Sequence, residues 1–214
     1  MDIKRIIVFG ATGGTGREVV LQALKNGWAV TAMARTPAAL ALQHPYLDIV
    51  KADVLQPSGL EADIAGAAAV ISCLGTGTGR KPTTLYSAGM TNIVSAMQQA
   101  GVGRLICFSA GALDTYKEMG AFARTIATFI LQPLLKHPFA DLRLMESIVE
   151  RSQLDWTIVR PPRLVNKPLR GKYRVAIGSH LRFPSSIARA DLAHYMLGII
   201  DNRQAFQAKA EISY

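Results

Sequence analysis

The sequence contains no apolar run long enough to cross a bilayer and only two cysteines. A membrane-spanning helix needs about 20 consecutive apolar residues, and no run approaches that length. The opening stretch MDIKRIIVFG lacks the long apolar region and small-residue cleavage site of a signal peptide. Cys73 and Cys107 lie inside apolar runs, which is typical of buried thiols in a reducing compartment rather than of a disulfide framework. We therefore expect a cytoplasmic protein without a membrane span.

Acidic residues are scarce relative to basic ones. The chain has 15 Asp and Glu against 24 Lys and Arg, a formal net charge of +9. The basic residues are scattered, and no basic block carries interleaved aromatic residues, so we do not expect a nucleic-acid partner. The balance favours a generally basic surface or a site for anionic ligands.

Several catalytic motifs are also missing. The four histidines show no metal-ligand spacing, so no metal site is expected, and there is no G-x-S-x-G elbow of a hydrolase. None of the six tyrosines is followed by lysine four residues later, so the Tyr-x-x-x-Lys pair of many dehydrogenases is absent. His194 falls in a mostly apolar segment and is expected to be packed rather than catalytic.

What the sequence does contain is an alternation of apolar runs and helical patterns. Half of the 214 residues are hydrophobic, enough for one substantial core. Strands are expected at residues 6–10, 28–35, 46–53, 68–75, 104–111, 154–162 and 209–214. Helices are expected at residues 14–26, 37–42, 57–66, 82–100, 140–152 and 188–200. This order predicts an α/β fold with a doubly wound parallel sheet covered on both faces, in a single domain over residues 1–214.

The segment 114–138 does not fit this alternation. It includes the unusually apolar stretch FARTIATFILQPLL, which Pro133 interrupts. Two interpretations are open: a lid or wall over a pocket, or an ordinary core helix.

Three glycines mark the first strand-to-helix turn, in the stretch VFGATGGTGREVV. A helix N-terminus presents unpaired N–H groups and the positive end of the helix dipole, where phosphate binds if no side chain blocks it. Gly10 permits the tight turn, Gly13 lets the backbone approach a pyrophosphate, and Gly16 lets the helix pack closely. Gly14 and Thr15 complete the same turn. This context predicts a dinucleotide site in a Rossmann-type fold.

Further blocks follow this turn in a specific order: AR, KADVLQP, CLGT, FSAG and ESIVERSQLDWTIVRPPRL. Together with GATGGTG they cover essentially the whole chain. In this pattern the chain resembles the atypical short-chain dehydrogenase/reductase family of flavin reductase and biliverdin-IXβ reductase and its bacterial NAD(P)H-binding relatives. The resemblance implies a nicotinamide cofactor and hydride transfer. The stretch after FSAG is longer and more apolar than in biliverdin-reducing members, so the resemblance specifies the cofactor and not the substrate.

The end of the second strand indicates which nicotinamide cofactor binds. An acidic residue there would bind the ribose 2′-hydroxyl of NAD, whereas arginine accommodates the 2′-phosphate of NADP. Here Arg35 lies 19 residues beyond Gly16, and no carboxylate follows until Asp48. We therefore expect NADP(H) to be preferred over NAD(H), the alternative being that Arg35 is a solvated surface residue.

The resemblance places other residues around the cofactor. It implies Thr12 and Thr36 near the 2′-phosphate, with Arg17 as a further candidate, and Asp53 and Val54 beside the adenine. Asp53 alternatively caps the following turn. Leu74, Gly75 and Thr76 follow the fourth strand and should line the ribose and phosphate side, which also fits the carboxyl ends of parallel strands.

The nicotinamide end is assigned in the same way. The family keeps a serine near the nicotinamide at the position of Ser109, which we take as the candidate catalytic and cofactor-binding residue. The loop of Pro161, Pro162 and Arg163 is implied to contact the carboxamide and to form a preset pocket wall. Arg143 and Glu146 on the preceding helix are expected to form an i,i+3 ion pair.

These expectations favour an NADPH-dependent reductase that passes hydride to a planar conjugated acceptor, such as a flavin, a quinone or a linear tetrapyrrole. Such an acceptor needs little acid–base help, which is compatible with the missing Tyr-x-x-x-Lys pair. The alternative is a non-catalytic NADP(H)-binding redox sensor or assembly protein. The small-molecule acceptor is the expected partner, and the chain is expected to be a monomer or weak dimer.

Overall fold

A mostly parallel sheet forms the centre of the computed structural model, which describes residues 3–56, 58–77, 81–113 and 132–214. Its strand order is β3-β2-β1-β4-β5-β6-β10-β8. The strands in this order are β3 (Leu47–Lys51), β2 (Ala29–Ala34), β1 (Arg5–Phe9), β4 (Ala69–Ser72), β5 (Arg104–Phe108), β6 (Asp155–Arg160), β10 (Ala208–Ser213) and β8 (Arg174–Ile177). All pairs are parallel except that of β10 with the edge strand β8. The order 3-2-1-4-5-6 is that of a doubly wound Rossmann fold, so the predicted fold class is confirmed.

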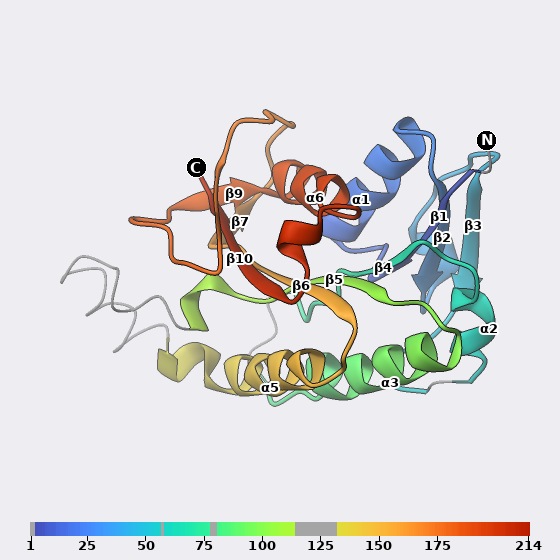
Figure 1. Ribbon diagram of the computed structural model, residues 1–214, viewed down its shortest axis with the longest axis horizontal. Coiled ribbons are helices and arrows are strands. Elements are labelled where there is room, and N and C mark those ends of the chain that lie inside the picture. The colour runs from blue at the N-terminus through green and yellow to red at the C-terminus, as the bar shows by residue number, and fades with distance from the viewer. Residues whose placement is uncertain (1–2, 57, 78–80, 114–131) are drawn as a thin grey trace.

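Helices cover both faces of this sheet (Figure 1). One layer contains α1 (Gly14–Lys25) and α6 (Arg189–Gly198), and the other contains α3 (Leu85–Gln99) and α5 (Gln132–Glu150), with the short α2 (Leu60–Ile64) beside α3. Single 3-10 turns lie at η1 (Pro37–Ala39), η2 (Gly111–Leu113) and η5 (Arg203–Ala205). The chain therefore has a hydrophobic core on each side of the sheet.

The first strand shows why the apolar runs are continuous. Ile6 and Val8 pack into the core under α1 and α6, whereas Ile7 and Phe9 pack into the core under α3 and α5. Side chains alternate between faces along a strand, so a strand covered on both faces needs apolar residues at every position. Each fully buried Ile or Val contributes about 1.5–3 kcal/mol relative to exposure.

Several elements differ from the expectations. The helix expected at residues 37–42 is the short 3-10 turn η1. Helix α5 covers Gln132–Glu150 and so extends N-terminally beyond the expected start at residue 140, continuing through Pro138. The edge strand β8 is antiparallel, and β7 (Arg163–Val165) pairs with β9 (Ser186–Ala188) in a separate two-stranded sheet. Of the predicted lid or wall, 114–138, residues 114–131 lie outside the described residues, and the rest belongs to α5.

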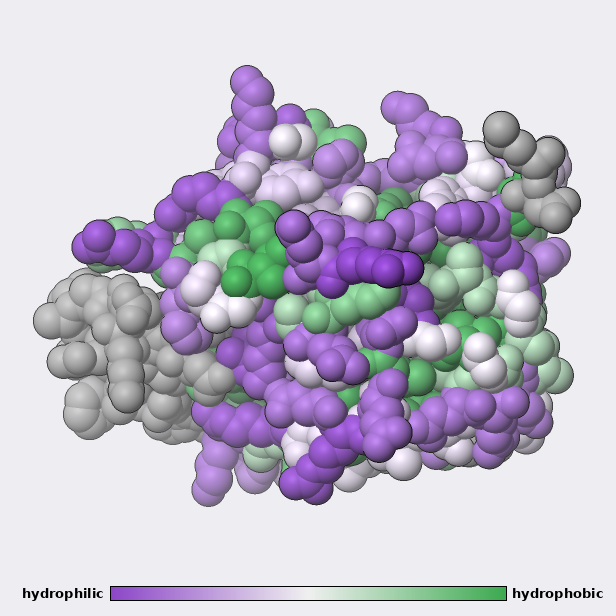
Figure 2. Space-filling view, viewed as in Figure 1, coloured by the Kyte–Doolittle hydropathy of each residue, from purple (hydrophilic) through white to green (hydrophobic). Residues whose placement is uncertain are grey.

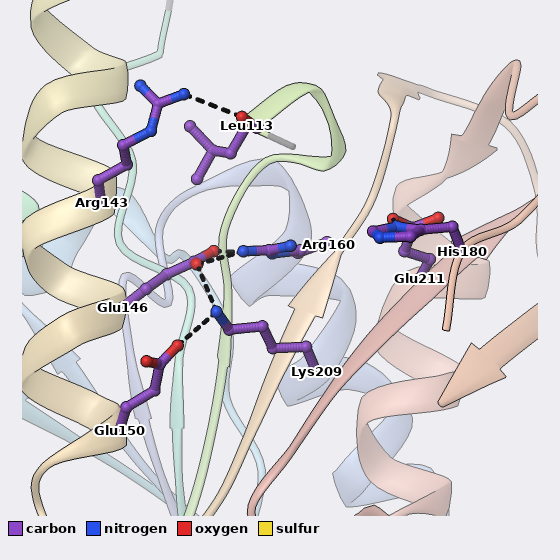
Figure 3. A network of polar contacts seen from close by, with 8 residues as sticks. All are labelled: Leu113, Arg143, Glu146, Glu150, Arg160, His180, Lys209 and Glu211. Atoms are coloured by element: carbon purple, nitrogen blue, oxygen red, sulfur yellow. Dashed lines mark hydrogen bonds and ion pairs between the residues drawn. The ribbon is translucent and has the colours of Figure 1, made fainter. Parts of the chain in front are cut away.

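A polar network joins α5 to the sheet (Figure 3). Arg160 at the end of β6 makes a two-pronged ion pair with Glu146, with Nε–Oε1 and Nη2–Oε2 distances of 3.0 and 2.5 Å, and both side chains are about 95% buried. Lys209 on β10 contacts the same carboxylate at 3.4 Å and also pairs with Glu150. The predicted Arg143–Glu146 pair is wrong, because Arg143 donates instead to the Leu113 carbonyl at 2.9 Å.

The expectation that His194 is packed can be compared with the structure. His194 is exposed rather than packed, and its Nδ1 lies 2.7 Å from the Tyr173 hydroxyl.

Figure 2 shows hydrophilic side chains spread over the face in view, with hydrophobic residues in separate patches. No helix in the described part of the chain is both long and apolar enough to span a membrane.

Candidate functional site

Two glycine positions of the turn after β1 have no room for a side chain. Gly10 adopts a positive φ of 71°, and a Cβ there would lie 2.4 Å from the carbonyl oxygen of Cys73. A Cβ at Gly16 would lie 2.2 Å from the Gly10 carbonyl oxygen, because the first turn of α1 packs directly on the end of β1. Gly13, the N-cap of α1, donates its N–H to the Gly10 carbonyl at 3.0 Å. The glycines thus permit a turn whose backbone faces outward at the start of a helix.

The N-terminus of α1 is suited to an anion. No side chain caps it, and its first turn contains no acidic residue among the described residues. The first N–H groups of a helix have no intrahelical acceptor, and the helix dipole makes this end positive. A phosphate group is the ligand that such an end binds most readily.

A cavity of about 340 Å³ opens beside this turn, at the carboxyl ends of β1, β2, β4 and β5. Its volume lies within the ~300–1,000 Å³ range of small-molecule sites. It is lined by Phe9, Gly10, Thr12, Gly13, Gly14, Thr15, Met33, Ala34, Arg35, Ala52, Val54, Cys73, Leu74, Gly75, Gly77, Leu85, Tyr86, Phe108, Leu164 and Arg189. Among these described residues there is no carboxylate, and the two formal charges are those of Arg35 and Arg189. The cavity is therefore chemically suited to an anionic ligand with apolar, planar parts.

The cavity brings together half of the cofactor-site residues predicted from the sequence. Its lining includes Gly10, Thr12, Gly13, Gly14, Thr15, Arg35, Val54, Leu74 and Gly75. Gly16 lies beneath the turn and supports it. Thr76 is adjacent to the lining, and its N–H donates to the hydroxyl of the lining residue Tyr86 at 3.2 Å.

Other predicted residues lie near the cavity without lining it. Asp53 accepts the Leu55 N–H at 3.0 Å, which is the turn-capping role considered as its alternative. Thr36 is exposed next to Arg35, and Arg17 donates to the Leu40 carbonyl. The lining does not include Pro161, Pro162 or Arg163. Their loop instead contributes the next residue, Leu164, and Pro161 accepts the Gly111 N–H at 2.8 Å.

Ser109 directly follows the lining residue Phe108. Its side chain is about 95% buried, and its hydroxyl has no hydrogen-bond partner within the described residues. Ser109 is not itself a lining residue, but buried polar atoms are nearly always paired, so its hydroxyl has capacity for a further hydrogen bond. The backbone of Ser109 is fixed by its N–H bond to Val159 at 2.8 Å.

The thiols are not activated for chemistry. Cys73 lines the cavity, but burial raises its pKa to about 12. Burial also raises the pKa of Cys107. Since the thiolate is the reactive form, neither side chain has the environment of a catalytic nucleophile.

Sequence reasoning missed several lining residues. Met33, Tyr86, Phe108 and Leu164 are apolar or aromatic residues in segments that were interpreted only as strands, helices or loops. Arg189 was missed because its closeness to the turn arises from the packing of α6 against α1. The available signal was its position at the start of a helix, directly after a short strand.

Comparisons with known proteins agree with this geometry. Residues 10–203 match the model of a family described as NAD(P)H-binding. An uncharacterised chloroplast protein of Arabidopsis thaliana is 31% identical over 176 residues, covering 78% of this chain and 62% of its own length. Photosystem II assembly factor Ycf39 of Synechocystis is 24% identical, covering 73% of this chain and 44% of its own length. The chain thus spans less than two thirds of these curated relatives.

A solved structure supports the fold. The wide-type short-chain dehydrogenase/reductase of Veillonella parvula, in complex with NADP, superposes with a TM-score of 0.80 at 16% identity, covering 100% of this chain and 95% of that one. The match over residues 10–203, on a Rossmann fold with a glycine-lined cavity, shows that this chain belongs to the NAD(P)H-binding family.

Proposed function

We propose that this protein is an NADP(H)-dependent reductase that passes hydride to a planar conjugated acceptor such as a flavin, a quinone or a linear tetrapyrrole. The observation that carries this proposal is the cavity at the glycine turn, which has Arg35 at the end of β2 and no carboxylate among its described lining residues. An acidic residue at that strand end would favour NAD(H), whereas a guanidinium matches the geometry of a 2′-phosphate.

We assign each part of this cofactor to residues in or beside the cavity. The N–H groups at Gly14 and Thr15, in the first turn of α1, would hold the pyrophosphate. The Gly13 N–H already donates to the Gly10 carbonyl, so Gly13 would shape the turn that lets the backbone approach the phosphates. Arg35, Thr12 and Thr36 would hold the 2′-phosphate. Three further groups complete the cofactor site: Asp53 and Val54 for the adenine; Leu74, Gly75 and Thr76 for the ribose; and Ser109, Pro161, Pro162 and Arg163 for the nicotinamide.

The chemistry asked of the protein is modest. When bound, the nicotinamide supplies the hydride. Ser109 would donate its unpaired hydroxyl to the carboxamide or the acceptor, and Phe108, Tyr86 and Leu164 would shield the site from water. The sequence has no Tyr-x-x-x-Lys proton donor. An acceptor whose protons come from solvent is therefore favoured over a simple ketone.

A second candidate function is a non-catalytic NADP(H)-binding sensor or assembly protein. It is favoured by the similarity to Ycf39, which is named as a photosystem II assembly factor.

We also propose a cytoplasmic location and a monomer or weak dimer for this chain, although the Arabidopsis relative is named as chloroplastic.

One experiment separates these functions. Purified protein is mixed with NADPH or NADH, with and without FMN, a quinone or biliverdin, and absorbance of the reduced nicotinamide is followed. Acceptor-dependent oxidation that is faster with NADPH supports the reductase. Tight NADPH binding without oxidation by any acceptor would favour the sensor or assembly protein, and failure to bind either dinucleotide would reject both.

A further inference from the structure

Arg189 lies directly on the glycine-rich turn. It is the first residue of α6, and its side chain is only partly exposed. A Cβ added to Gly14 would lie 2.6 Å from the Cδ and 2.8 Å from the Nε of Arg189. The guanidinium stem therefore occupies the space that the missing side chain of Gly14 leaves open.

Arg189 and Arg35 lie beside different parts of the proposed dinucleotide site. Arg35 follows β2, where an adenosine ribose would lie, whereas Arg189 covers Gly14 at the N-terminus of α1. The cavity lining contains no carboxylate that would neutralise either charge, within the described residues. Two positive features, the helix end and this guanidinium, thus face the same part of the cavity.

Arg189 already has one neutral partner. Its Nη1 donates to Oδ1 of Asn166 at 2.7 Å. Asn166 directly follows β7 and Arg189 directly follows β9, and these strands pair with each other. The β7–β9 sheet therefore holds the guanidinium beside the turn through a bond that a charged phosphate oxygen can outcompete.

We propose that Arg189 binds the pyrophosphate of the dinucleotide, exchanging its bond to Asn166 for a phosphate oxygen. This inference rests on the proposed dinucleotide site and assigns the residue that closes it. Because the pyrophosphate is common to NADP and NAD, Arg189 contributes to the affinity for both and does not select between them. Selection by the 2′-phosphate belongs to Arg35.

The test compares the variants Arg189→Met and Arg35→Met, which keep an aliphatic stem at each position. Dissociation constants are measured for NADPH, NADH and adenosine 2′-monophosphate, which has the 2′-phosphate but no pyrophosphate. We expect Arg189→Met to weaken the binding of NADPH and of NADH by a similar factor of about 10–100, as for the loss of a charged hydrogen bond. The affinity for adenosine 2′-monophosphate should not change. Arg35→Met is expected to weaken the binding of NADPH and of adenosine 2′-monophosphate and to leave the affinity for NADH unchanged.

Further variants guard against an indirect effect. Arg189→Lys keeps the charge and should recover part of the lost affinity. Asn166→Ala removes the competing bond and should leave NADPH affinity unchanged or up to a few-fold tighter. Thermal unfolding of each variant checks that it is folded.

The outcomes are distinct. Unchanged dinucleotide affinity in folded Arg189→Met, or a loss confined to NADPH, would overturn the assignment while the proposed function stands. A reductase whose acceptor KM alone rises in Arg189→Met would also overturn it, because the guanidinium would then bind the acceptor. Absence of dinucleotide binding by the unmodified protein would reject the proposed function together with this inference.

Discussion

Two polar regions of the molecule, the network between α5 and the sheet and the glycine turn after β1, differ in how their charges are compensated. Between α5 and the sheet, Arg160, Glu146, Lys209 and Glu150 neutralise one another (Figure 3). At the glycine turn, the helix N-terminus has no capping side chain, and no carboxylate lines the cavity within the described residues. Paired charges join elements of the fold, whereas uncompensated positive charge in a cavity favours the binding of an anionic ligand.

The largest expected effect comes from breaking the paired region. Arg160→Met leaves the buried Glu146 carboxylate without its main partner, and such losses cost about 3–5 kcal/mol of folding free energy. Urea unfolding measures this loss of folding free energy. The double variant Arg160→Met with Glu146→Leu should be distinctly more stable than Arg160→Met alone, and equal stability of the two would contradict the assigned pairing.

A smaller loss of stability, with a large loss of binding, is expected at the turn. Gly16→Ala places a Cβ 2.2 Å from the backbone oxygen of Gly10, so the start of α1 must shift at a cost of roughly 1–3 kcal/mol. NADPH titration should show affinity reduced at least tenfold in the folded variant. Gly198→Ala is the matched control, because its Cβ meets no atom of the described residues within 4 Å. Wild-type affinity in Gly16→Ala would show that the turn does not need this close packing.

Arg35 allows the charge of the cavity to be changed without altering the fold. Arg35→Ala should reduce the preference for NADPH over NADH by about 10–100-fold, since one charged contact to phosphate is lost. The side chain is exposed, so the unfolding temperature should not change. Parallel titrations with both dinucleotides provide the measurement, and an unchanged preference would remove Arg35 from the 2′-phosphate site.

The smallest effect concerns pH. Burial raises the pKa of Cys73 to about 12, so the unfolded chain releases this thiol proton at lower pH than the folded chain. The folded state therefore loses stability as pH rises above the ordinary thiol pKa of ~8.5. Between pH 8 and 10.5, the unfolding free energy of Cys73→Ala should fall less steeply than that of the unmodified protein. Parallel slopes would show that this thiol does not contribute.

The sequence predicted those features that depend on local pattern. Continuous apolar runs located the main parallel strands to within a few residues, and the glycine turn together with the carboxyl ends of those strands pointed to part of the cavity lining. Glycine spacing identified the turn, where a Cβ at Gly10 or Gly16 would clash with backbone atoms.

Features that depend on distant contacts were not predictable in this way. Glu146 pairs with Arg160 through the packing of α5 on β6, so helical spacing alone suggested the wrong partner, Arg143. The edge strand β8 has a mixed, half-buried pattern that resembles a loop. Arg189 reaches the turn only because α6 packs beside α1.

The position of β10 has a consequence for the order in which the protein is assembled. This strand is made after β8 in the chain, yet it lies between β6 and β8 in the sheet. During synthesis, at about 5–20 residues per second, residues 174–177 must wait a few seconds before their partner strand emerges. The half of the sheet that carries the glycine turn can form earlier, so the nascent chain can build its anion-binding end before its far edge is closed.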